Sequence, residues 1–340
     1  MSAATRTKRL RLAGWLAVLV LALLVPFLFG SFRVGQFTQA LALAIAVLGL
    51  NLLVGYSGQI SLGHGAFFAL GAYVSAILIV DHSVPYLVTL PIAGAVCAVA
   101  GFLLGLPALR LHGLYLALVT LGVAIAAPQI IKRAEGITGG TQGLSVDRPA
   151  APAWTGLADD QYLYFVTVAV VALMFLLAAG LVRGRVGRAL IAIRENEIAA
   201  KTMGVDLARY KTGAFAVSAA YAGLGGALFT LPIGFLAPES FPLALSFAFL
   251  AAIVVGGLAT IGGALFGALF IEFVPVYAAD VNEALAGVIY GSVLILFMYL
   301  LPGGVMGIRR QISGRRAGPQ EQDGPAEKRR TEQVKTAGQV

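Results

Sequence analysis

The sequence predicts an all-α membrane protein, a polytopic bundle of about 8–10 transmembrane segments with some broken or re-entrant helices. Three observations lead to this fold class. Of the 340 residues, 59% are hydrophobic and 12% are charged, whereas soluble proteins carry about 25% charged residues. The apolar residues form repeated runs near the length that crosses a bilayer, about 20 residues. The sequence lacks the short alternating segments of an outer-membrane barrel.

The apolar runs define ten candidate spans, taken in chain order. They are residues 13–30, 38–55, 57–80, 85–107, 113–131, 162–182, 212–231, 245–258, 261–278 and 284–301. The first run follows a basic N-terminus, and no clear small-residue cleavage pattern follows it, so we expect an uncleaved first span. Residues 245–278 are short for two full crossings. Their centre, Gly256–Gly263, is either a tight cytoplasmic turn or the tip of a re-entrant pair of half-helices.

The net charge of +8 is confined to three hydrophilic pieces of the chain. Residues 1–12 hold four basic side chains, residues 183–211 hold seven basic and three acidic ones, and residues 302–340 hold eight basic and four acidic ones. By the positive-inside rule, both termini and the loop 183–211 are expected in the cytoplasm. Because the basic residues neither interleave with aromatics nor form one face, nucleic-acid binding is not expected.

We therefore expect two regions. Residues 1–308 form the transmembrane domain, with the loop 183–211 on its cytoplasmic side. Residues 309–340 form a basic cytoplasmic tail, polar enough to remain disordered.

The stretch GYSGQISLGHGAFFALGAY, Gly55 to Tyr73, interrupts the apolar sequence with glycines and polar residues. One interpretation is a helix broken at membrane depth, whose freed backbone groups bond to nearby side chains and border a polar path. The other is a cytoplasmic turn between two spans, in which the histidine serves only as a cap or hydrogen-bonding group. The candidate path residues are Gly58, Gln59, Ser61, Gly63, His64 and Gly65.

Residues 187–204 contain many alanines and few helix breakers, so they predict a single cytoplasmic helix that ends at Gly204. A short helix with a small-residue face fits a groove on a partner, and charged residues at its edge would set orientation. The alternative is a basic loop that packs on lipid head groups. The candidate contact residues are Arg194, Glu197, Ala199, Ala200, Lys201 and Gly204.

Two further places are candidates for function. Glu272 lies within a predicted span, where a carboxylate is costly. It either borders the translocation path, reaches an interface, or stays protonated and hydrogen bonded to a neighbouring helix. The second place is the outer-loop stretch GITGGTQGL, which is a site for a carboxylate or anion, a contact for a substrate-binding protein, or a surface turn. Its candidate residues are Thr138, Gly139, Gly140, Gln142 and Gly143.

The sequence shows no catalytic constellation, metal-ligand spacing or cofactor fingerprint, so we expect a protein that is not an enzyme. The phosphate-binding pattern G-x-x-x-x-G-K-[ST] does not occur in the chain. We therefore expect no cofactor here, and any ATP and magnesium should bind to separate chains.

Five stretches in order resemble the inner-membrane permease of branched-chain amino acid ABC importers, of the LivM type. They are GYSGQISLGHGAFFALGAY, GITGGTQGL, GRVGRALIAIRENEIAAKTMGVDLARYK, GGLATIGGALFGALFI and LPGGVMGI, within about residues 38–308. The acidic–small–glycine pattern from Glu197 to Gly204 is similar to the EAA loop of such permeases, through which ATPase subunits act.

The resemblance implies alternating access in a bacterial inner (plasma) membrane. It also implies four kinds of partner: two ABC ATPase subunits, a second related permease, a periplasmic or extracytoplasmic substrate-binding protein, and an amino acid substrate. Two alternatives stay open. Related permeases carry urea or amides, and an ion-coupled secondary transporter would use Glu272 as its coupling group.

Overall fold

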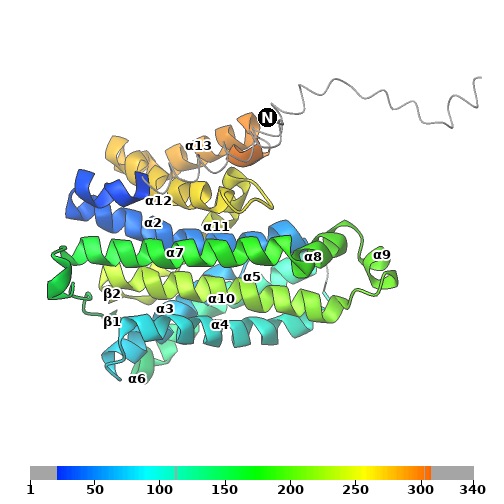
Figure 1. The fold of residues 1–340 in the computed structure, drawn as a ribbon, viewed down its shortest axis with the longest axis horizontal. Coiled ribbons are helices and arrows are strands. Elements are labelled where there is room, and N and C mark those ends of the chain that lie inside the picture. Colours follow the sequence, from blue (N-terminus) through cyan, green and yellow to red (C-terminus); the bar gives the residue numbers. More distant parts are fainter. Residues whose placement is uncertain (1–20, 112, 302, 308–340) are drawn as a thin grey trace, which may run out of the picture.

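The computed structural model describes residues 21–111, 113–301 and 303–307, and these form a bundle of long helices that run side by side (Figure 1). Residues 21–28 are helical. The further elements are α2 (Ser31–Leu50), η1 (Asn51–Tyr56, a π-helix), α3 (His64–Val80), α4 (Tyr86–Ala108), α5 (Leu114–Arg133), α6 (Glu135–Thr138), β1 (Leu144–Ser145), η2 (Ala153–Thr155), α7 (Asp159–Arg183), α8 (Arg185–Glu195), α9 (Glu197–Thr202), α10 (Leu207–Ile233), β2 (Phe235–Leu236), η3 (Pro238–Ser240), α11 (Leu243–Gly256), α12 (Gly263–Val281), η4 (Glu283–Leu285) and α13 (Ala286–Leu300).

The bundle has two distinct ends. We call the end that carries α8 and α9 the α9 end, and the opposite end, where β1 and β2 pair, the β end (Figure 1). β1 and β2 are antiparallel, with Leu144 opposite Leu236 and Ser145 opposite Phe235. In the described part of the chain these are the only strands, so the all-α prediction is confirmed.

Two helices form the centre of the fold. α10 packs against α2, α3 and α4, and α2 packs in addition against α7 and α12. The apolar windows of the α2–η1 segment and of α10 are 78% and 72% buried, against 39% or less for the other long segments. The remaining helices therefore turn much of their apolar surface away from the protein, as lipid-facing helices do.

Small residues let the central helices touch backbone to backbone. A β-carbon added at Gly226 of α10 would lie 1.9 Å from the carbonyl oxygen of Phe68 in α3, and one at Gly71 would lie 2.2 Å from that of Gly223. Comparable close contacts, with at least one neighbouring atom at 3.0 Å or less, occur at Gly101, Gly105, Gly225, Gly263 and Gly267. These glycines therefore serve close helix packing, because van der Waals contact between backbones holds helices together in lipid.

Eight segments in the described ranges are long and apolar enough to cross a membrane. The predicted span 57–80 is wrong in its first part, because residues 57–63 are not helical and α3 begins at His64. The predicted span 38–55 begins earlier, at Ser31. Residues 13–20 of the predicted span 13–30 and all of the tail 309–340 lie outside the described residues.

The loop after α7 differs from the single helix expected over residues 187–204. It contains two helices, α8 and α9, separated at Asn196. Asn196 adopts an extended conformation, and its side-chain Oδ1 accepts a hydrogen bond from the Ala199 amide at 3.0 Å. This is N-capping, which starts a new helix and thereby ends the preceding one.

The helices α11 and α12 form a hairpin whose connection, residues 257–262, turns through glycine backbone. Gly257 has φ +109°, and a β-carbon at Gly256 would meet the carbonyl oxygen of Gly263 at 2.0 Å. The two ends of the hairpin therefore touch through main chain alone. The connection also contacts η1 through Asn51.

We predict that Gly226→Ala lowers the thermal stability of the detergent-solubilised protein. The added methyl group has to displace the α3 backbone, and overpacking of this kind costs about 1–3 kcal/mol or more. Gly213→Ala on the same helix is the matched control, because a β-carbon there meets nothing within 4 Å. The control should leave the melting temperature unchanged or raise it, since alanine is the better helix former. Equal melting temperatures for the two variants would contradict the prediction.

Candidate functional site: a discontinuous helix joined to the α8–α9 loop

The chain between η1 and α3 enters the bundle as an extended segment. The ring Nε2 of His64 lies 2.7 Å from the carbonyl oxygen of Ala46. Ala46 lies ten residues before the end of η1, which is about 15 Å along a helix. Residues 57–63 therefore run back from the α9 end toward the middle of the bundle, and α3 starts there. Of the two interpretations of this stretch, the broken helix is the one that the structure bears out.

The inner part of the extended segment is buried, and its backbone groups have partners there. Leu62 donates its amide hydrogen to Thr120 Oγ1 at 2.9 Å, and Gly65 donates to Ser246 Oγ at 3.1 Å. Ser57 Oγ donates to the Leu53 carbonyl at 2.7 Å and so closes the end of η1. An irregular backbone inside a membrane protein is tolerated only when its polar groups are satisfied in this way. Thr120 and Ser246, which the sequence did not single out, supply two of these bonds from other helices.

His64 has a structural position in this conformation. Its side chain is 1% exposed, and its ring packs edge-on against Phe249. Because a carbonyl oxygen only accepts, Nε2 is the donor in the contact with Ala46, which fixes the tautomer. Ser61 and Gly63 are also buried, whereas Gly58 is exposed. These candidate path residues therefore lie together, mostly enclosed by protein.

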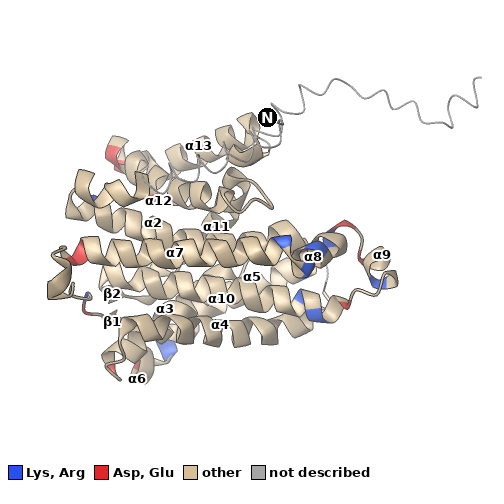
Figure 2. Ribbon diagram, in the orientation of Figure 1, with Lys and Arg blue, Asp and Glu red and all other residues tan. Residues whose placement is uncertain are grey.

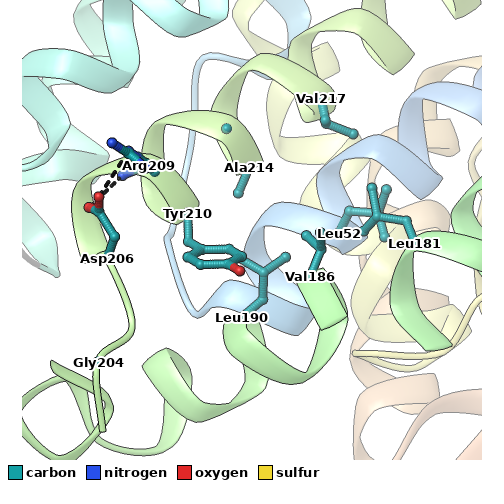
Figure 3. Close-up of a pocket in the computed structure, with 11 residues that line it drawn as sticks. Leu52, Leu181, Val186, Leu190, Gly204, Asp206, Arg209, Tyr210, Ala214 and Val217 are labelled. Carbon is teal, nitrogen blue, oxygen red and sulfur yellow. Dashed lines mark hydrogen bonds and ion pairs between the residues drawn. The ribbon is translucent and has the colours of Figure 1, made fainter. Parts of the chain in front are cut away.

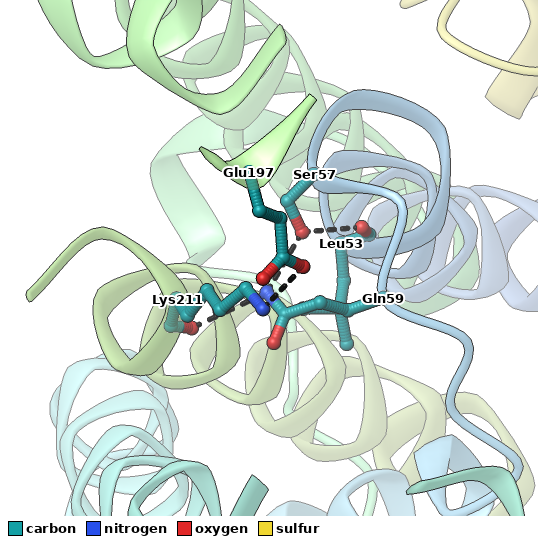
Figure 4. Close-up of polar contacts among 5 residues, drawn as sticks. All are labelled: Leu53, Ser57, Gln59, Glu197 and Lys211. Carbon is teal, nitrogen blue, oxygen red and sulfur yellow. Dashed lines mark hydrogen bonds and ion pairs between the residues drawn. The ribbon is translucent and has the colours of Figure 1, made fainter. Parts of the chain in front are cut away.

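The α8–α9 loop is connected to the extended segment through α10. Lys211, at the start of α10, forms an ion pair with Glu197 of α9, and its backbone carbonyl accepts a weak 3.5 Å hydrogen bond from Gln59 Nε2 (Figure 4). The lysine side chain is only 6% exposed. Since a buried ammonium is unfavourable without an anionic partner, this pair holds α9 against the end of α10.

A second contact comes from α8. The guanidinium of Arg194 donates a hydrogen bond to the Gly55 carbonyl in η1. The same side chain lies over Gly58, where an added β-carbon would meet Arg194 Cγ at 3.1 Å. The structure therefore brings together two sets of candidates that are far apart in sequence: Arg194 and Glu197 of the loop, and Gly58 and Gln59 of the broken helix.

The end of α9 is formed as expected at Gly204. Gly204 has φ +82°, its amide donates to the Lys201 carbonyl, and the Val205 amide donates to the Ala200 carbonyl, both at 3.0 Å. These two bonds are a Schellman motif, for which glycine is favoured. Ala200 is buried within the chain, while Ala199 and Lys201 are exposed.

The most exposed apolar side chains of this loop are ones that the sequence analysis passed over. Ile198 and Met203 are 79% and 84% exposed. They flank the small Ala199 on the outer surface of the loop. Exposed apolar side chains near a small-residue face are typical of a protein contact surface.

A cavity of about 440 Å³ lies beside the loop, between α7, α8 and α10 (Figure 3). Leu181, Val186, Leu190 and Val217 are among its apolar lining residues. The ion pair between Asp206 and Arg209, 3.0 Å long, lies at its edge. Because the charged groups here already pair with each other, the cavity offers a polar solute little to bind.

The hairpin connection 257–262 is attached to η1 by one buried side chain. Asn51 Nδ2 donates to the Thr260 carbonyl at 2.8 Å, and the Ala259 amide donates to Asn51 Oδ1 at 2.9 Å. Asn51 is 1% exposed. Its amide thus satisfies both a carbonyl and an amide of the connection, and couples the α11–α12 hairpin to the helix that ends at the break.

The glycine-rich stretch 136–144 forms a tight turn at the β end. Gly139 and Gly143 have positive φ angles, and a β-carbon at Gly143 would lie 2.2 Å from the Leu236 carbonyl oxygen. Thr138 Oγ1 donates to the Ile131 carbonyl at 2.7 Å and accepts from the Gly140 amide. Gln142 is exposed. The glycines therefore have a structural reason to be present, and only the tip of the turn is open to a partner.

Glu272 lies in α12, half-buried. Among the described residues the structure gives it neither an ion pair nor a hydrogen bond to a neighbouring helix. Glu272 lines neither the 440 Å³ cavity beside the α8–α9 loop nor a second cavity of about 670 Å³ at the β end. The structure thus places Glu272 apart from the broken helix and from the α8–α9 loop.

Comparison with known proteins decides the family. The family described as "Branched-chain amino acid transport system / permease component" matches residues 32–298. The chain belongs to this family. It is 36% identical over 317 residues to the high-affinity branched-chain amino acid transport system permease protein LivM of Escherichia coli (strain K12), an alignment that covers 86% of this chain and 74% of the relative. The identity to LivM of Salmonella typhimurium is also 36%, over 87% of this chain and 75% of the relative.

More distant family members are similar too. A protein described as the probable permease LivH of Methanocaldococcus jannaschii is 28% identical over 287 residues, 78% of this chain and 89% of the relative. No solved structure matches the chain. The expectation of a permease of the branched-chain amino acid transport family is confirmed, and the chain is a transport subunit built of membrane helices.

We predict that Asn51→Leu loosens the hairpin connection. The substitution keeps the number and branching of the side-chain heavy atoms but leaves the Thr260 carbonyl and the Ala259 amide without their partner, which costs about 1–3 kcal/mol for each buried group. Hydrogen exchange at residues 257–262 of the variant should become faster than in the unaltered protein, while exchange in α4 stays unchanged. Asn196→Leu, at an exposed asparagine that caps α9, is the control and should not affect the connection. Unchanged exchange at 257–262 in Asn51→Leu would contradict this role of Asn51.

Proposed function

We propose that the chain is the permease subunit of an ATP-binding cassette importer that carries branched-chain or other hydrophobic amino acids inward by alternating access. Support for the substrate class comes from the family match and from the names of the similar permeases. Support for ATP-driven movement comes from one observation. The α8–α9 loop contacts the discontinuous helix directly through Arg194 and Gly55, and it contacts α10 through the Glu197–Lys211 ion pair.

In this proposal, two ATPase chains bind the α8–α9 loop and move it during their cycle. Ile198, Ala199 and Met203 form the outer surface of the loop and would enter a groove of the ATPase. Arg194 and Glu197 face inward and pass the movement to Gly55 and Lys211. The extended segment 57–63 and α3 then shift relative to α2, and a polar path opens beside Gln59, Ser61 and His64. ATP and magnesium bind to the partner chains.

The orientation follows from the charge distribution. Basic residues gather at α8, α9 and the first turns of α10, while the middle of the bundle is almost free of charge (Figure 2). The positive-inside rule thus supports an orientation in which the α9 end faces the cytoplasm of a bacterium with the chain in its inner membrane. The β end then faces a periplasmic or extracytoplasmic substrate-binding protein, for which Thr138, Gly139, Gly140, Gln142 and Gly143 are the candidate contact. A second, related permease chain completes the pore.

The test is uptake of radiolabelled leucine by proteoliposomes that contain the permease pair, the ATPases and the binding protein. A Lys→Ala change in the ATPase phosphate-binding loop should abolish uptake, and a protonophore should leave it unchanged. Accumulation driven by an ion gradient without ATPases would instead support the ion-coupled alternative. Uptake of urea or acetamide with no uptake of leucine, isoleucine or valine would overturn the substrate class.

We predict that Lys211→Met reduces amino acid uptake at least about tenfold while the assembled importer still hydrolyses ATP. Loss of the buried ammonium frees α9 from α10, and the partly exposed Glu197 keeps the cost in stability to about 1–3 kcal/mol. Uptake and ATP hydrolysis are measured in the same proteoliposomes. Arg209→Met is the matched control, since Arg209 lies two residues away on α10 with an exposed side chain, and it should retain most of the uptake. Should Lys211→Met transport normally, the ion pair has no part in coupling.

A further inference from the structure

The largest of the described cavities, about 670 Å³, lies at the β end between the first turns of α2 and α7, the last residues of α10 and the segment after β1. Its volume falls within the range of small-molecule pockets, about 300–1,000 Å³. Neither the candidate path residues nor the outer-loop residues line it. The proposed function therefore leaves this cavity without a role.

The cavity brings together opposite charges that do not pair. Arg148 comes from the segment after β1, and Asp160 from the first turn of α7. In the described parts of the chain, neither side chain has an ion-pair partner within 4.0 Å. Asp159 also lines the cavity, but its Oδ1 already accepts a 2.6 Å hydrogen bond from the Ala151 amide. A guanidinium and a carboxylate thus border one space that is too wide for them to meet directly.

The rest of the lining adds polar and apolar contacts. Gln36 is 7% exposed, and its Oε1 accepts from Arg33 at 3.1 Å, which leaves its amide nitrogen without a partner among the described residues. Gln39 lies one turn further along the same helix. Leu163, Pro232 and Ile233 provide an apolar wall. A few polar groups that fix orientation, set against an apolar surface, are what a pocket for a small amphipathic molecule requires.

We propose that this cavity is a binding site for a zwitterionic aliphatic amino acid on its way into the permease. Arg148 binds the carboxylate, Asp160 binds the ammonium group, and the aliphatic side chain packs on Leu163 and Ile233. The inference rests on the proposed function, since it gives an amino acid permease a site where the substrate first leaves its binding protein. A molecule with both charges satisfies both unpaired groups at once, which neither a purely cationic nor a purely anionic solute does.

The test is protection of a thiol placed in the cavity. The chain has one cysteine, Cys97, which is buried. Gln39→Cys is introduced into the permease, assembled with its partner chains in nanodiscs, and its reaction with a small maleimide is followed without binding protein. Leucine should slow the reaction, whereas leucinamide, which lacks the carboxylate, and 4-methylpentanoate, which lacks the ammonium group, should protect much less. Thr141→Cys, at an exposed loop position outside the cavity, should react equally with and without leucine.

Charge-neutral variants then test the assigned groups. Arg148→Gln or Asp160→Asn in the Gln39→Cys protein should raise the leucine concentration needed for half protection about tenfold, as loss of one charge-assisted contact predicts. Matched controls of the same charge at the same end are Arg133→Gln and Asp147→Asn, both exposed and outside the cavity. They should leave protection unchanged.

Four outcomes overturn the inference: no protection at any leucine concentration, equal protection by all three probes, equal effects of the test and control variants, and loss of the maleimide reaction on assembly with the second permease. Equal protection would indicate that apolar filling, rather than zwitterion recognition, occurs there. Loss of maleimide reaction on assembly with the second permease, before any leucine is added, would show a protein contact surface instead of a binding site. Leucine uptake by the complete importer distinguishes failure of the proposed function from failure of the proposed binding site. If uptake is intact and protection is absent, the proposed function stands and only this site is wrong.

Discussion

The fold depends on one constraint, which is that every backbone amide and carbonyl inside an apolar medium needs a hydrogen-bond partner. The extended segment 57–63 and the first turn of α3 meet it with side chains from two other helices and from the segment itself. Thr120, Ser246 and Ser57 each bond to a backbone group that a continuous helix would have satisfied internally. These bonds offset the free-energy cost of the break in the helix, and they also attach the segment to α5, α11 and η1. A movement of the segment therefore has to exchange one set of partners for another.

The same constraint explains how the loop and the break are connected. Arg194 donates to the backbone carbonyl of Gly55 in the last turn of η1, where a helix terminus leaves acceptors open. Lys211 pairs with the carboxylate of Glu197 and so holds α9 beside it. Asn51, the first residue of η1, forms hydrogen bonds with the Thr260 carbonyl and the Ala259 amide of the hairpin connection. Three separate parts of the chain thus meet at one helix end. The contacts between the α8–α9 loop, α10, η1 and the hairpin connection are therefore concentrated at the α9 end, whereas the centre of the bundle is held by close glycine packing.

The local patterns of the sequence were enough to predict most of the helices and the end of α9 at Gly204, because these depend on glycine and on apolar run lengths. They gave the break near Gly58 only as one of two interpretations. They also contained an unused signal at Asn196, a preferred N-cap residue just before Glu197. The partners of Asn51 and Lys211 could not be predicted in this way. Asn51 bonds to Thr260, which is 209 residues away, and Lys211 looked like one more basic residue of a cytoplasmic loop. Contacts of this kind follow from tertiary packing alone.

A last consequence follows from α10, which is 27 residues long and unbroken by any extended stretch. Such a rod measures about 40 Å. At one end it holds Glu197 through Lys211, and just beyond the other end the Gly234 carbonyl accepts the amide of Val146, two residues before Arg148. Under the proposed function, a tilt of α10 at the end that contacts the α8–α9 loop would displace its other end in the opposite direction. One helix would then link the two surfaces of the permease.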